Sequence, residues 1–197
     1  MPDIDEAGSF ALGSTRVNRL GYGAMQLVGP GVVGPPKDRA AALAVLRLAI
    51  ASGVKRIDIS DFHGPQVANQ IIREALRPYP VGLGIVTKIS ARRGSDGAWL
   101  PAFTPPELTQ AGHDNRRNLR LDVLAVINSR SMVGIHAPAE GSIEEPLTVL
   151  AELHRHGPVR QIGLSNVTPT ELAEGRWVRT SFASRTTKTL LTAPTMG

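Results

Sequence analysis

The stretch RIDISDFHGP occupies residues 56–65 and decides how the rest of the chain is interpreted. Ile57 and Ile59 flank Asp58, so an acidic side chain lies inside an apolar run that is typical of a buried strand. His63 follows, and the Gly-Pro pair after it indicates that the strand opens there into a loop. An acid and a histidine at the end of a buried strand suggest a functional position if other strands end at the same place.

Strands and helices alternate along the chain around this stretch. The predicted strands are near-continuous apolar runs, and the segments between them have helical spacing with recognisable ends, such as Asp38 before one helix and Gly53 after it. Thr104 followed by two prolines marks another helix start. After a hairpin that begins at residue 10, strands are predicted in residues 19–27, 54–60, 81–89, 122–130 and 159–166. This order predicts an α/β fold made of parallel βα units.

Polar residues at the strand ends favour a barrel over an open sheet. They are Asp58, Lys88, Asn128 and the pair Ser165-Asn166, each at the end of a different predicted strand. In a (β/α) barrel these ends converge on one mouth, whereas in an open sheet they would be spread along an edge. The GYGAMQ stretch lacks the third glycine of a dinucleotide-binding GxGxxG loop. We therefore predict a parallel TIM-barrel-type fold that is incomplete, with about five to six of the eight βα units and an N-terminal β-hairpin.

Composition limits the class of protein. Hydrophobic residues make up 42% of the 197 residues and aromatic residues only 4%, so the core must be aliphatic. The absence of cysteine excludes disulfides and thiolate metal sites. The acidic N-terminus lacks the apolar core of a signal peptide, and no apolar run approaches the ~18 residues that span a membrane. We expect a soluble cytoplasmic protein with no membrane partner.

Basic charge is concentrated at the C-terminal end. The net charge is +5, and four of these charges come from Arg176, Arg179, Arg185 and Lys188 in an acid-free segment. The remainder of the chain is close to neutral, which argues against a nucleic-acid partner. We predict a folded domain at residues 1–175, followed by an atypical basic, Ser/Thr-rich tail at 176–197.

Five motifs in order resemble the aldo-keto reductases, and in particular one bacterial branch of that family. They are RLGYGAMQL, GVKRIDISDFHGP, IIREAL, IVTK and QIGLSN, and the resemblance covers about residues 9–175. It implies a (β/α) barrel that uses NADPH to reduce a small aldehyde or ketone. In that family an aspartate, a tyrosine, a lysine and a histidine stand at the barrel mouth, and the lysine, paired with the aspartate, lowers the pKa of the proton-donating tyrosine.

The resemblance assigns roles to particular residues. Asp58 and Lys88 match the family aspartate and lysine, His63 stands where the tyrosine is expected, and Asn128 stands near the position of the family histidine. These four are the predicted catalytic residues. The implied cofactor contacts are Gly23, Ala24, Met25, Asp58, Ser165 and Asn166, the last two at the nicotinamide carboxamide.

Several of these residues also have structural interpretations. Asp58 and Lys88 can form an ion pair without a catalytic role, and backbone groups can satisfy Asn128. Ser165 and Asn166 can cap the following helix, although Thr168 could do the same. A histidine titrates near pH 6.5 and can in principle act as an acid, but the ammonium of Lys88 should lower the pKa of His63.

Length is the main departure from the family. A barrel of this type needs roughly 250 residues, and the family pattern stops near Gly175, before the segment that holds the ribose phosphate. Five strands cannot close a barrel, so we expect the exposed edges to form a homo-oligomer, to recruit the tail or to aggregate.

Three functions follow from these observations. The first is NADPH-dependent reduction of a small carbonyl compound. The second is cofactor-independent acid–base chemistry by His63, Asp58 and Lys88. The third is an inactive remnant or binding protein. No metal site is predicted, because His154 and His156 suit the C-terminal dipole of their helix better than a metal.

Overall fold

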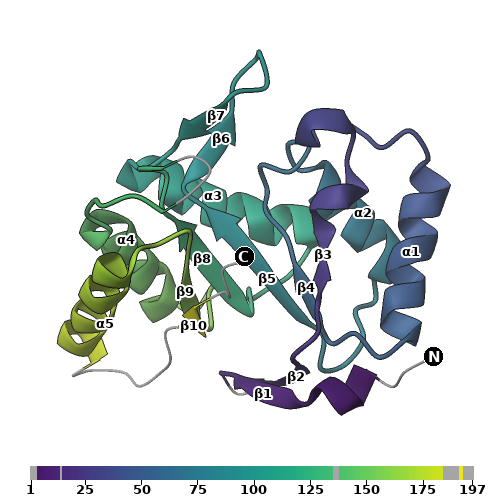
Figure 1. Cartoon of the computed structure of the whole chain (residues 1–197), viewed down its shortest axis with the longest axis horizontal. Helices are drawn as coiled ribbons and strands as arrows, with labels where there is room; N and C mark the ends of the chain where they lie inside the picture. Colours follow the sequence, from purple (N-terminus) through teal and green to yellow (C-terminus); the bar gives the residue numbers. More distant parts are fainter. Residues whose placement is uncertain (1–3, 14, 135–137, 184–190, 193–197) are drawn as a thin grey trace.

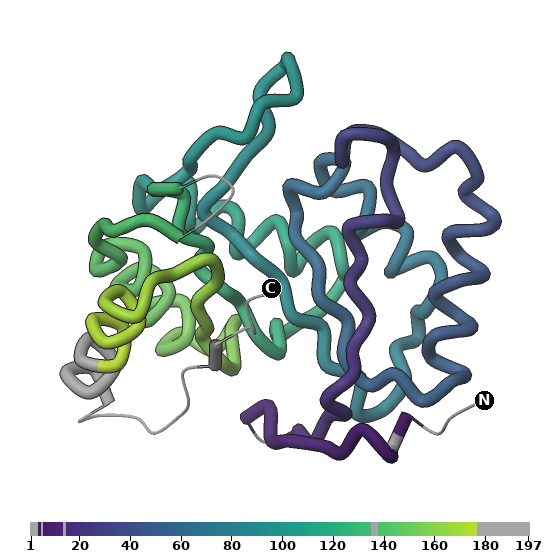
Figure 2. The backbone as a smooth tube through the Cα atoms, in the orientation of Figure 1, coloured from purple at the N-terminus to yellow at the C-terminus, as the bar shows by residue number. Residues whose placement is uncertain are grey.

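The computed structural model describes residues 4–13, 15–134, 138–183 and 191–192. Figure 1 shows a curved sheet with the helices arranged around it in chain order, α1 and α2 at the right of the view, α3 in the middle, and α4 and α5 at the left. The backbone trace in Figure 2 shows the N-terminal hairpin at one end of the sheet and a second hairpin that projects at the opposite end. The two ends of the sheet therefore differ in what covers them.

All strand pairs of the main sheet are parallel, in the order β10-β9-β8-β5-β4-β3. Five of these strands are the five that the sequence predicts, and the α/β fold with parallel βα units and an N-terminal hairpin is confirmed. The sixth, β10, comes from the predicted tail and pairs with β9. The bounds are β3 (Tyr22–Gly23), β4 (Arg56–Asp58), β5 (Gly84–Ile89), β8 (Val126–Arg130), β9 (Ile162–Ser165) and β10 (Leu191–Thr192).

The helices begin where the sequence signals predict. Asp38 caps α1 by accepting a hydrogen bond from the backbone N–H of Ala41 (2.9 Å). Thr104 and Glu107 form a capping box at the start of α3. The helices are α1 (Arg39–Ala51), α2 (Val67–Leu76), α3 (Pro105–Leu119), α4 (Glu144–Arg155) and α5 (Pro169–Ala183), with short 3₁₀ turns η1 (Ile4–Ala7), η2 (Ala24–Leu27) and η3 (Pro30–Val32). The division expected at 175/176 falls inside α5, and that domain boundary stays a prediction.

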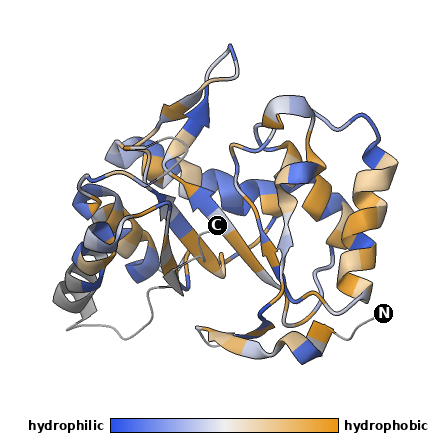
Figure 3. Cartoon of the chain, in the orientation of Figure 1, coloured by the Kyte–Doolittle hydropathy of each residue, from blue (hydrophilic) through white to orange (hydrophobic). Residues whose placement is uncertain are grey.

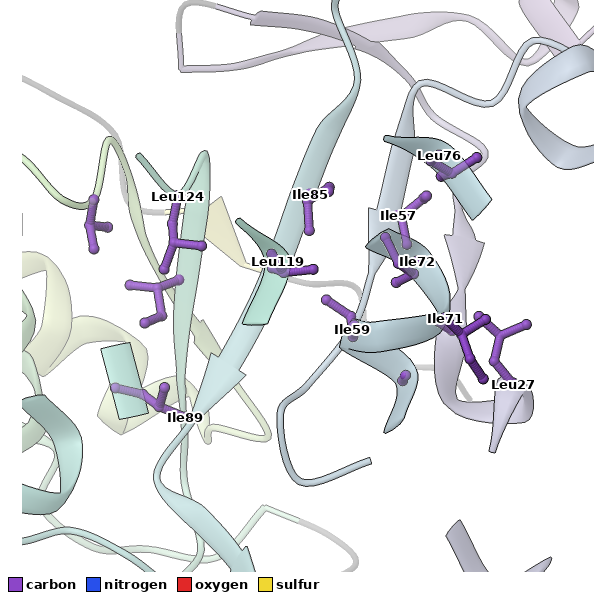
Figure 4. Packing of buried hydrophobic residues seen from close by; sticks show 14 of the residues in the cluster. Leu27, Ile57, Ile59, Ile71, Ile72, Leu76, Ile85, Ile89, Leu119 and Leu124 are labelled. Atoms are coloured by element: carbon purple, nitrogen blue, oxygen red, sulfur yellow. The ribbon is translucent and has the colours of Figure 1, made fainter. Parts of the chain in front are cut away.

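The face of the sheet that meets the helices carries the main core. Ile57 and Ile59 of the β4 region are fully buried and lie in one cluster with Ile71 and Ile72 of α2 (Figure 4). Ile127 of β8 joins the same cluster. We call this the outer face, and its burial explains why the strands are almost continuously apolar.

The opposite face, here called the inner face, is apolar at the end that the N-terminal hairpin covers. Leu12 and Val17 of the hairpin β1 (Ser9–Leu12)–β2 (Thr15–Asn18) pack against Val86 and Val126 of the sheet. Because side chains alternate along a strand, residues two positions further on, such as Lys88, point to this same face. The hairpin therefore closes the end of the sheet that is remote from the predicted site.

A second hairpin lies between the predicted strand at residues 81–89 and the helix that begins after Thr104, where the sequence predicts no strand. It consists of β6 (Ala91–Arg93) and β7 (Trp99–Pro101), which pair antiparallel. The guanidinium of Arg93 lies 4.2 Å from the centroid of the Trp99 ring, so a cation–π contact holds the two strands together. Strands this short carry no periodic signal, which is why the sequence did not reveal them.

Some apolar surface is left exposed on α1. Figure 3 shows a largely hydrophobic α1, and its Val45 and Leu48 are 44% and 58% exposed. At one edge of the sheet, β10 covers β9. Recruitment of the tail is thus seen at one edge, whereas a homo-oligomer and a cytoplasmic location stay predictions. No helix in the described part of the chain is long and apolar enough to cross a membrane.

Candidate functional site

The predicted catalytic residues gather at the carboxyl ends of neighbouring strands, on the inner face. Asp58 lies opposite Val86 in the register of β4 and β5, and Lys88 lies opposite Asn128 in that of β5 and β8. Val86 contacts the N-terminal hairpin, so the side chains one pleat further along the strands form the next layer of the inner face. The topology therefore brings together residues that are 30 and 40 positions apart.

An ion pair joins the first two strand ends. The Nζ of Lys88 donates to Oδ1 of Asp58 and lies 3.5 Å from the carbonyl oxygen of Ile59. The Lys88 side chain is 14% exposed and that of Asp58 30%, so water reaches the pair in part. The catalytic and the purely structural interpretation of Asp58 and Lys88 both require this ion pair, so its geometry alone does not distinguish them.

His63 is buried beside this pair. The turn that places it is tight, because a Cβ on Gly64 would lie 2.8 Å from the Cβ of Val67, and Gly64 has a φ of +79°. Phe62 makes edge contacts with both His63 and Trp99 of the projecting hairpin, at centroid distances of 5.4 and 5.2 Å. The aromatic contacts and the turn hold the imidazole in one place.

Burial lowers the pKa of His63 to about 3, with further lowering by the charges of Lys88, Arg93 and Arg130. The effect of Lys88 has the direction that the sequence analysis expects, but desolvation is the larger cause. Nδ1 of His63 is buried and has no hydrogen-bond partner among the described residues. At neutral pH the ring is therefore uncharged.

Asn128 faces the same layer. Its Oδ1 is buried and accepts no hydrogen bond from the residues that the structure describes. The interpretation that backbone groups satisfy this oxygen is therefore wrong. A buried acceptor without a donor is costly, and a ligand that donates to it would remove that cost.

Ser165 is the last residue of β9, and Asn166 follows it. The Nδ2 of Asn166 donates to the carbonyl oxygens of Ser131 (2.9 Å) and Gly134 (2.8 Å), which fixes the loop after β8. A ligand could thus meet this amide only through Oδ1. The helix-cap interpretation of the pair is wrong, because Thr168 caps α5: its Oγ1 accepts from the backbone N–H of Glu171 at 3.2 Å.

The backbone after β3 borders Asp58. Gly23 is the register partner of Asp58, and a Cβ built on Gly23 would meet no atom within 4 Å. Ala24 is fully buried, whereas Met25 is 42% exposed. There is consequently open space beside Asp58 on the strand that was predicted to line the cofactor.

Two arginines lie at the site in addition to the residues that the sequence predicts there. Arg130 is the last residue of β8, and Arg93 lies on β6, and both are close enough to His63 to lower its pKa. The alternation Val126, Asn128, Arg130 could have placed Arg130 on the inner face. Arg93 offered no such signal, because the hairpin that carries it was not predicted. The described residues contain no group of three or more His, Asp or Glu that could hold a metal.

Comparison with known proteins gives relatives of one kind. The family model described as the aldo/keto reductase family matches residues 19–182. The chain is 66% identical over 171 residues to pyridoxine 4-dehydrogenase of Escherichia coli, covering 86% of this chain and 60% of that protein. It is 32% identical over 172 residues to an uncharacterised oxidoreductase of Schizosaccharomyces pombe, covering 87% and 54%. The chain thus spans little more than half the length of these relatives.

Solved structures share the fold at lower identity. A glycerol dehydrogenase from Gluconobacter oxydans superposes with a TM-score of 0.74 at 19% identity, over 94% of this chain and 63% of that one. An aldo/keto reductase from Klebsiella pneumoniae in complex with NADP and acetate gives a TM-score of 0.60 at 18% identity, over 82% and 50%. Together with the match of the family model to most of the sequence, these findings show that the chain belongs to the aldo/keto reductase family.

Proposed function

We propose that this chain reduces a small aldehyde or ketone with NADPH, using Asp58, Lys88 and His63. The observation that carries the proposal is the ion pair of Lys88 and Asp58 on adjacent strand ends, beside a buried, uncharged histidine. The named relative from Escherichia coli is a pyridoxine dehydrogenase, so pyridoxal, the corresponding aldehyde, is the first substrate to test.

The residues present fit the nicotinamide end of the cofactor. Space lies open at Gly23 beside Asp58, and the Oδ1 of Asn166 is left for a ligand amide. The buried Oδ1 of Asn128 has no donor among the residues that the structure describes. Ser165, at the end of β9, would complete the set of groups around a carboxamide. NADPH bound here would supply the hydride. Two relatives of known structure were crystallised with NADP or NADPH, which supports this choice of cofactor.

The protein must supply a proton to the carbonyl oxygen. With a pKa of about 3, His63 holds almost no proton charge at pH 7 and cannot serve as the acid. A neutral imidazole still donates one hydrogen bond, which would orient and polarise the carbonyl. The ammonium of Lys88, held by Asp58, is then the proton source for the oxygen as it becomes an alkoxide.

The first test is steady-state reduction of pyridoxal and of a panel of small aldehydes, followed through the absorbance of NADPH. We expect Lys88→Met to lower kcat/KM by about 10²-fold or more, since loss of a general acid typically has effects of this size. We expect no inflection near pH 6.5 in the wild-type profile, because His63 is already uncharged there. Arg155→Met, on an exposed i,i+3 pair with Glu152, is the matched control for the loss of a surface cation.

Two outcomes would contradict the proposal. One is carbonyl reduction that persists in Lys88→Met. The other is a thermal midpoint that NADPH does not raise, since a ligand at about 100 times its Kd adds roughly 2.7 kcal/mol to stability. Turnover of a carbonyl compound without NADPH, abolished by His63→Tyr, would favour the cofactor-independent alternative instead. A rise in NADPH-dependent activity in His63→Tyr would show that the site remains tuned for a phenol.

A further inference from the structure

His63 lacks the hydrogen bond that usually orients a functional imidazole. How such a ring is turned, and which nitrogen carries the proton, is commonly set by a partner at Nδ1. In this chain Nδ1 of His63 is buried and has no partner among the described residues. The ring contact that the structure shows is an edge contact with Phe62, with centroids 5.4 Å apart and planes at 88°. The orientation of His63 therefore depends on how firmly Phe62 is held.

Phe62 is held by the projecting hairpin. It is 4% exposed and lies in one apolar cluster with Ala91 of β6 and Met132 of the loop after β8. Trp99 of β7 packs against this cluster and makes an edge contact with Phe62, with centroids 5.2 Å apart. Phe62 thus contacts His63 and Trp99 at the same time and links the histidine to the hairpin.

Arg93 holds Trp99 in turn. The two residues are register partners across the hairpin, and the guanidinium carbon of Arg93 lies 4.2 Å from the centroid of the indole. Nη2 of Arg93 also donates to the carbonyl oxygen of Gly31 in η3. The cation is therefore fixed by the indole and by a carbonyl group of another segment, and it covers the indole in return.

Turn η3 closes this series of contacts. Gly31, which accepts from Arg93, precedes Val32, whose carbonyl oxygen accepts from the backbone N–H of Gly64 at 3.1 Å. Gly64 directly follows His63 in the chain. The members of the closed series are, in order, His63, Phe62, Trp99, Arg93, Gly31, Val32 and Gly64. Each member is held from two directions, so loss of one contact should loosen its neighbours.

The chain enters the hairpin through a strained residue. Ser90 has a φ of +84°, a conformation that residues with a side chain rarely adopt. Its Oγ hydrogen-bonds with Oγ of Ser129 at 3.0 Å, and its carbonyl oxygen accepts from the backbone N–H of Ala102 at 3.1 Å. Strain of this kind persists where the surrounding contacts over-determine it, and it is concentrated at functional sites. The base of the hairpin is therefore fixed as well as its contact with Phe62.

We propose that Trp99, held by Arg93, is a positioning residue that acts through Phe62 to keep the imidazole of His63 at the angle needed for a hydrogen bond to the substrate carbonyl. The inference rests on the proposed reductase function, because His63 orients the carbonyl there. Trp99 acts on the imidazole and not on the substrate. Its removal should therefore slow turnover without changing which aldehydes are preferred.

The kinetic test uses the full chain with NADPH and two aldehydes of different size, propanal and pyridoxal. We expect Trp99→Leu to lower kcat by about tenfold or more for both, because small misplacements of a reacting group have effects of this size or larger. KM should change by less than about threefold. Trp99→Phe keeps an aromatic edge and should recover most of the loss, and Arg93→Met should lower kcat by less than Trp99→Leu.

Two comparisons show whether the effect passes through His63. In a His63→Gln background, Trp99→Leu should lower kcat by less than about twofold, because residues that act through one another are not additive. The matched control is Arg92→Met, which removes the neighbouring cation of β6. Its side chain is 57% exposed and lies 3.8 Å from Glu107, and we expect no loss of kcat.

A second readout needs neither turnover nor NADPH. Diethyl pyrocarbonate acylates neutral imidazoles, and mass spectrometry of the digested protein gives the rate at each histidine. His63 is 6% exposed, whereas the side chain of His156 is 64% exposed, so His156 is the internal reference. We expect Trp99→Leu to raise the rate at His63 relative to His156 by about tenfold or more, since local loosening exposes a buried group. Trp99→Phe and Arg92→Met should leave this ratio unchanged, and thermal melts establish that each variant is folded.

The outcomes separate the two proposals. The positioning role is overturned if both Trp99→Leu and Arg93→Met keep their kcat, if the loss persists in full in the His63→Gln background, or if the preference between the two aldehydes changes, which would mean that Trp99 contacts the substrate. If neither aldehyde is reduced but the labelling ratio rises in Trp99→Leu and Arg93→Met, the reductase function fails while the placement of His63 by the hairpin stands. An unchanged ratio rejects that placement as well.

Discussion

The outer and inner faces of the sheet carry side chains of opposite character, apolar on the outer face and polar or charged at the site on the inner face. On the outer face, Ile57 and Ile127 are fully buried against helices. On the inner face, the neighbouring positions Asp58 and Asn128 are an ion-paired carboxylate and an amide whose buried oxygen has no donor in the described structure. One strand therefore contributes to a sealed apolar layer and to a polar site within two consecutive residues.

The difference shows where stability and function are located. Burial of apolar area stabilises the outer face, while the inner face keeps charges and unpaired polar atoms that would be removed if stability alone mattered. Polar groups also occur on the helix side, where Oδ1 of Asn115 accepts from Asn69 (3.2 Å) and Thr87 (2.5 Å), and where Oδ1 of Asn69 has no donor among the described residues. Substitutions on the two faces should consequently change the free energy of unfolding by different amounts and in different directions.

The largest effect is expected from truncation of the outer face. Ile57→Ala removes a fully buried side chain and should lower the free energy of unfolding by about 2–5 kcal/mol, through lost burial and the cavity that remains. Denaturant unfolding measures this change. Val81→Ala, at a fully exposed valine, is the control and should change stability by less than about 0.5 kcal/mol. Equal losses at the two positions would contradict the assignment of the core to this face.

A pH-dependent effect is expected at Asp61, in the turn that carries His63. Burial, and then the charge of Asp114, raise the pKa of Asp61 from 3.8 to about 7. A raised carboxyl pKa means that the folded state binds more protons, so stability is fully present below about pH 4 and is lost as the pH rises through 7. Asp61→Asn should therefore stabilise the protein increasingly from pH 4 to 7, by an amount on the order of a few kcal/mol at pH 8.

Thermal melts of Asp61→Asn across this pH range check the expectation. Asp122→Asn, at an exposed carboxylate, is the control and should show no gain that grows with pH. A destabilised Asp61→Asn at pH 8 would mean that the carboxylate is needed in its charged form, and the explanation from burial would then be wrong.

The smallest effect is expected on the inner face. Asn128→Leu removes a buried oxygen that has no donor in the described part of the chain and keeps a similar volume, so stability should change by less than about 1 kcal/mol or rise. Denaturant unfolding of the protein without cofactor measures it. A loss as large as that of Ile57→Ala would show that Asn128 is a structural residue and would remove the contrast between the faces.

Much of the fold was predictable because its signals are local. Asp38, Thr104 and Gly53 mark helix ends through backbone hydrogen bonds within a few residues, and the apolar strands stand out by composition. The β6–β7 hairpin was missed, because it is held by the contact of Arg93 with Trp99 and not by periodicity. Strand β10 was missed in a segment without periodicity, although the tail was among the expected covers for an open edge.

The sequence predicts part of the site, because some of its signals are also local. Asp58 and Lys88 could be assigned because parallel strands end at one edge, and alternation would have added Arg130. The Nδ1 of His63, which has no partner among the described residues, and the engaged Nδ2 of Asn166 depend on neighbours far away in sequence, so no pattern revealed them.

By itself, the sequence determined the parallel βα order, the helix caps and the strand ends that carry the acid and the lysine. These features follow from propensity, capping and alternation, which act over a few residues. The tertiary structure alone decided that three cations meet at one buried histidine and that its ring is uncharged at neutral pH. Desolvation and charge act through space, so their sum at one atom is known only when the strands are placed beside one another.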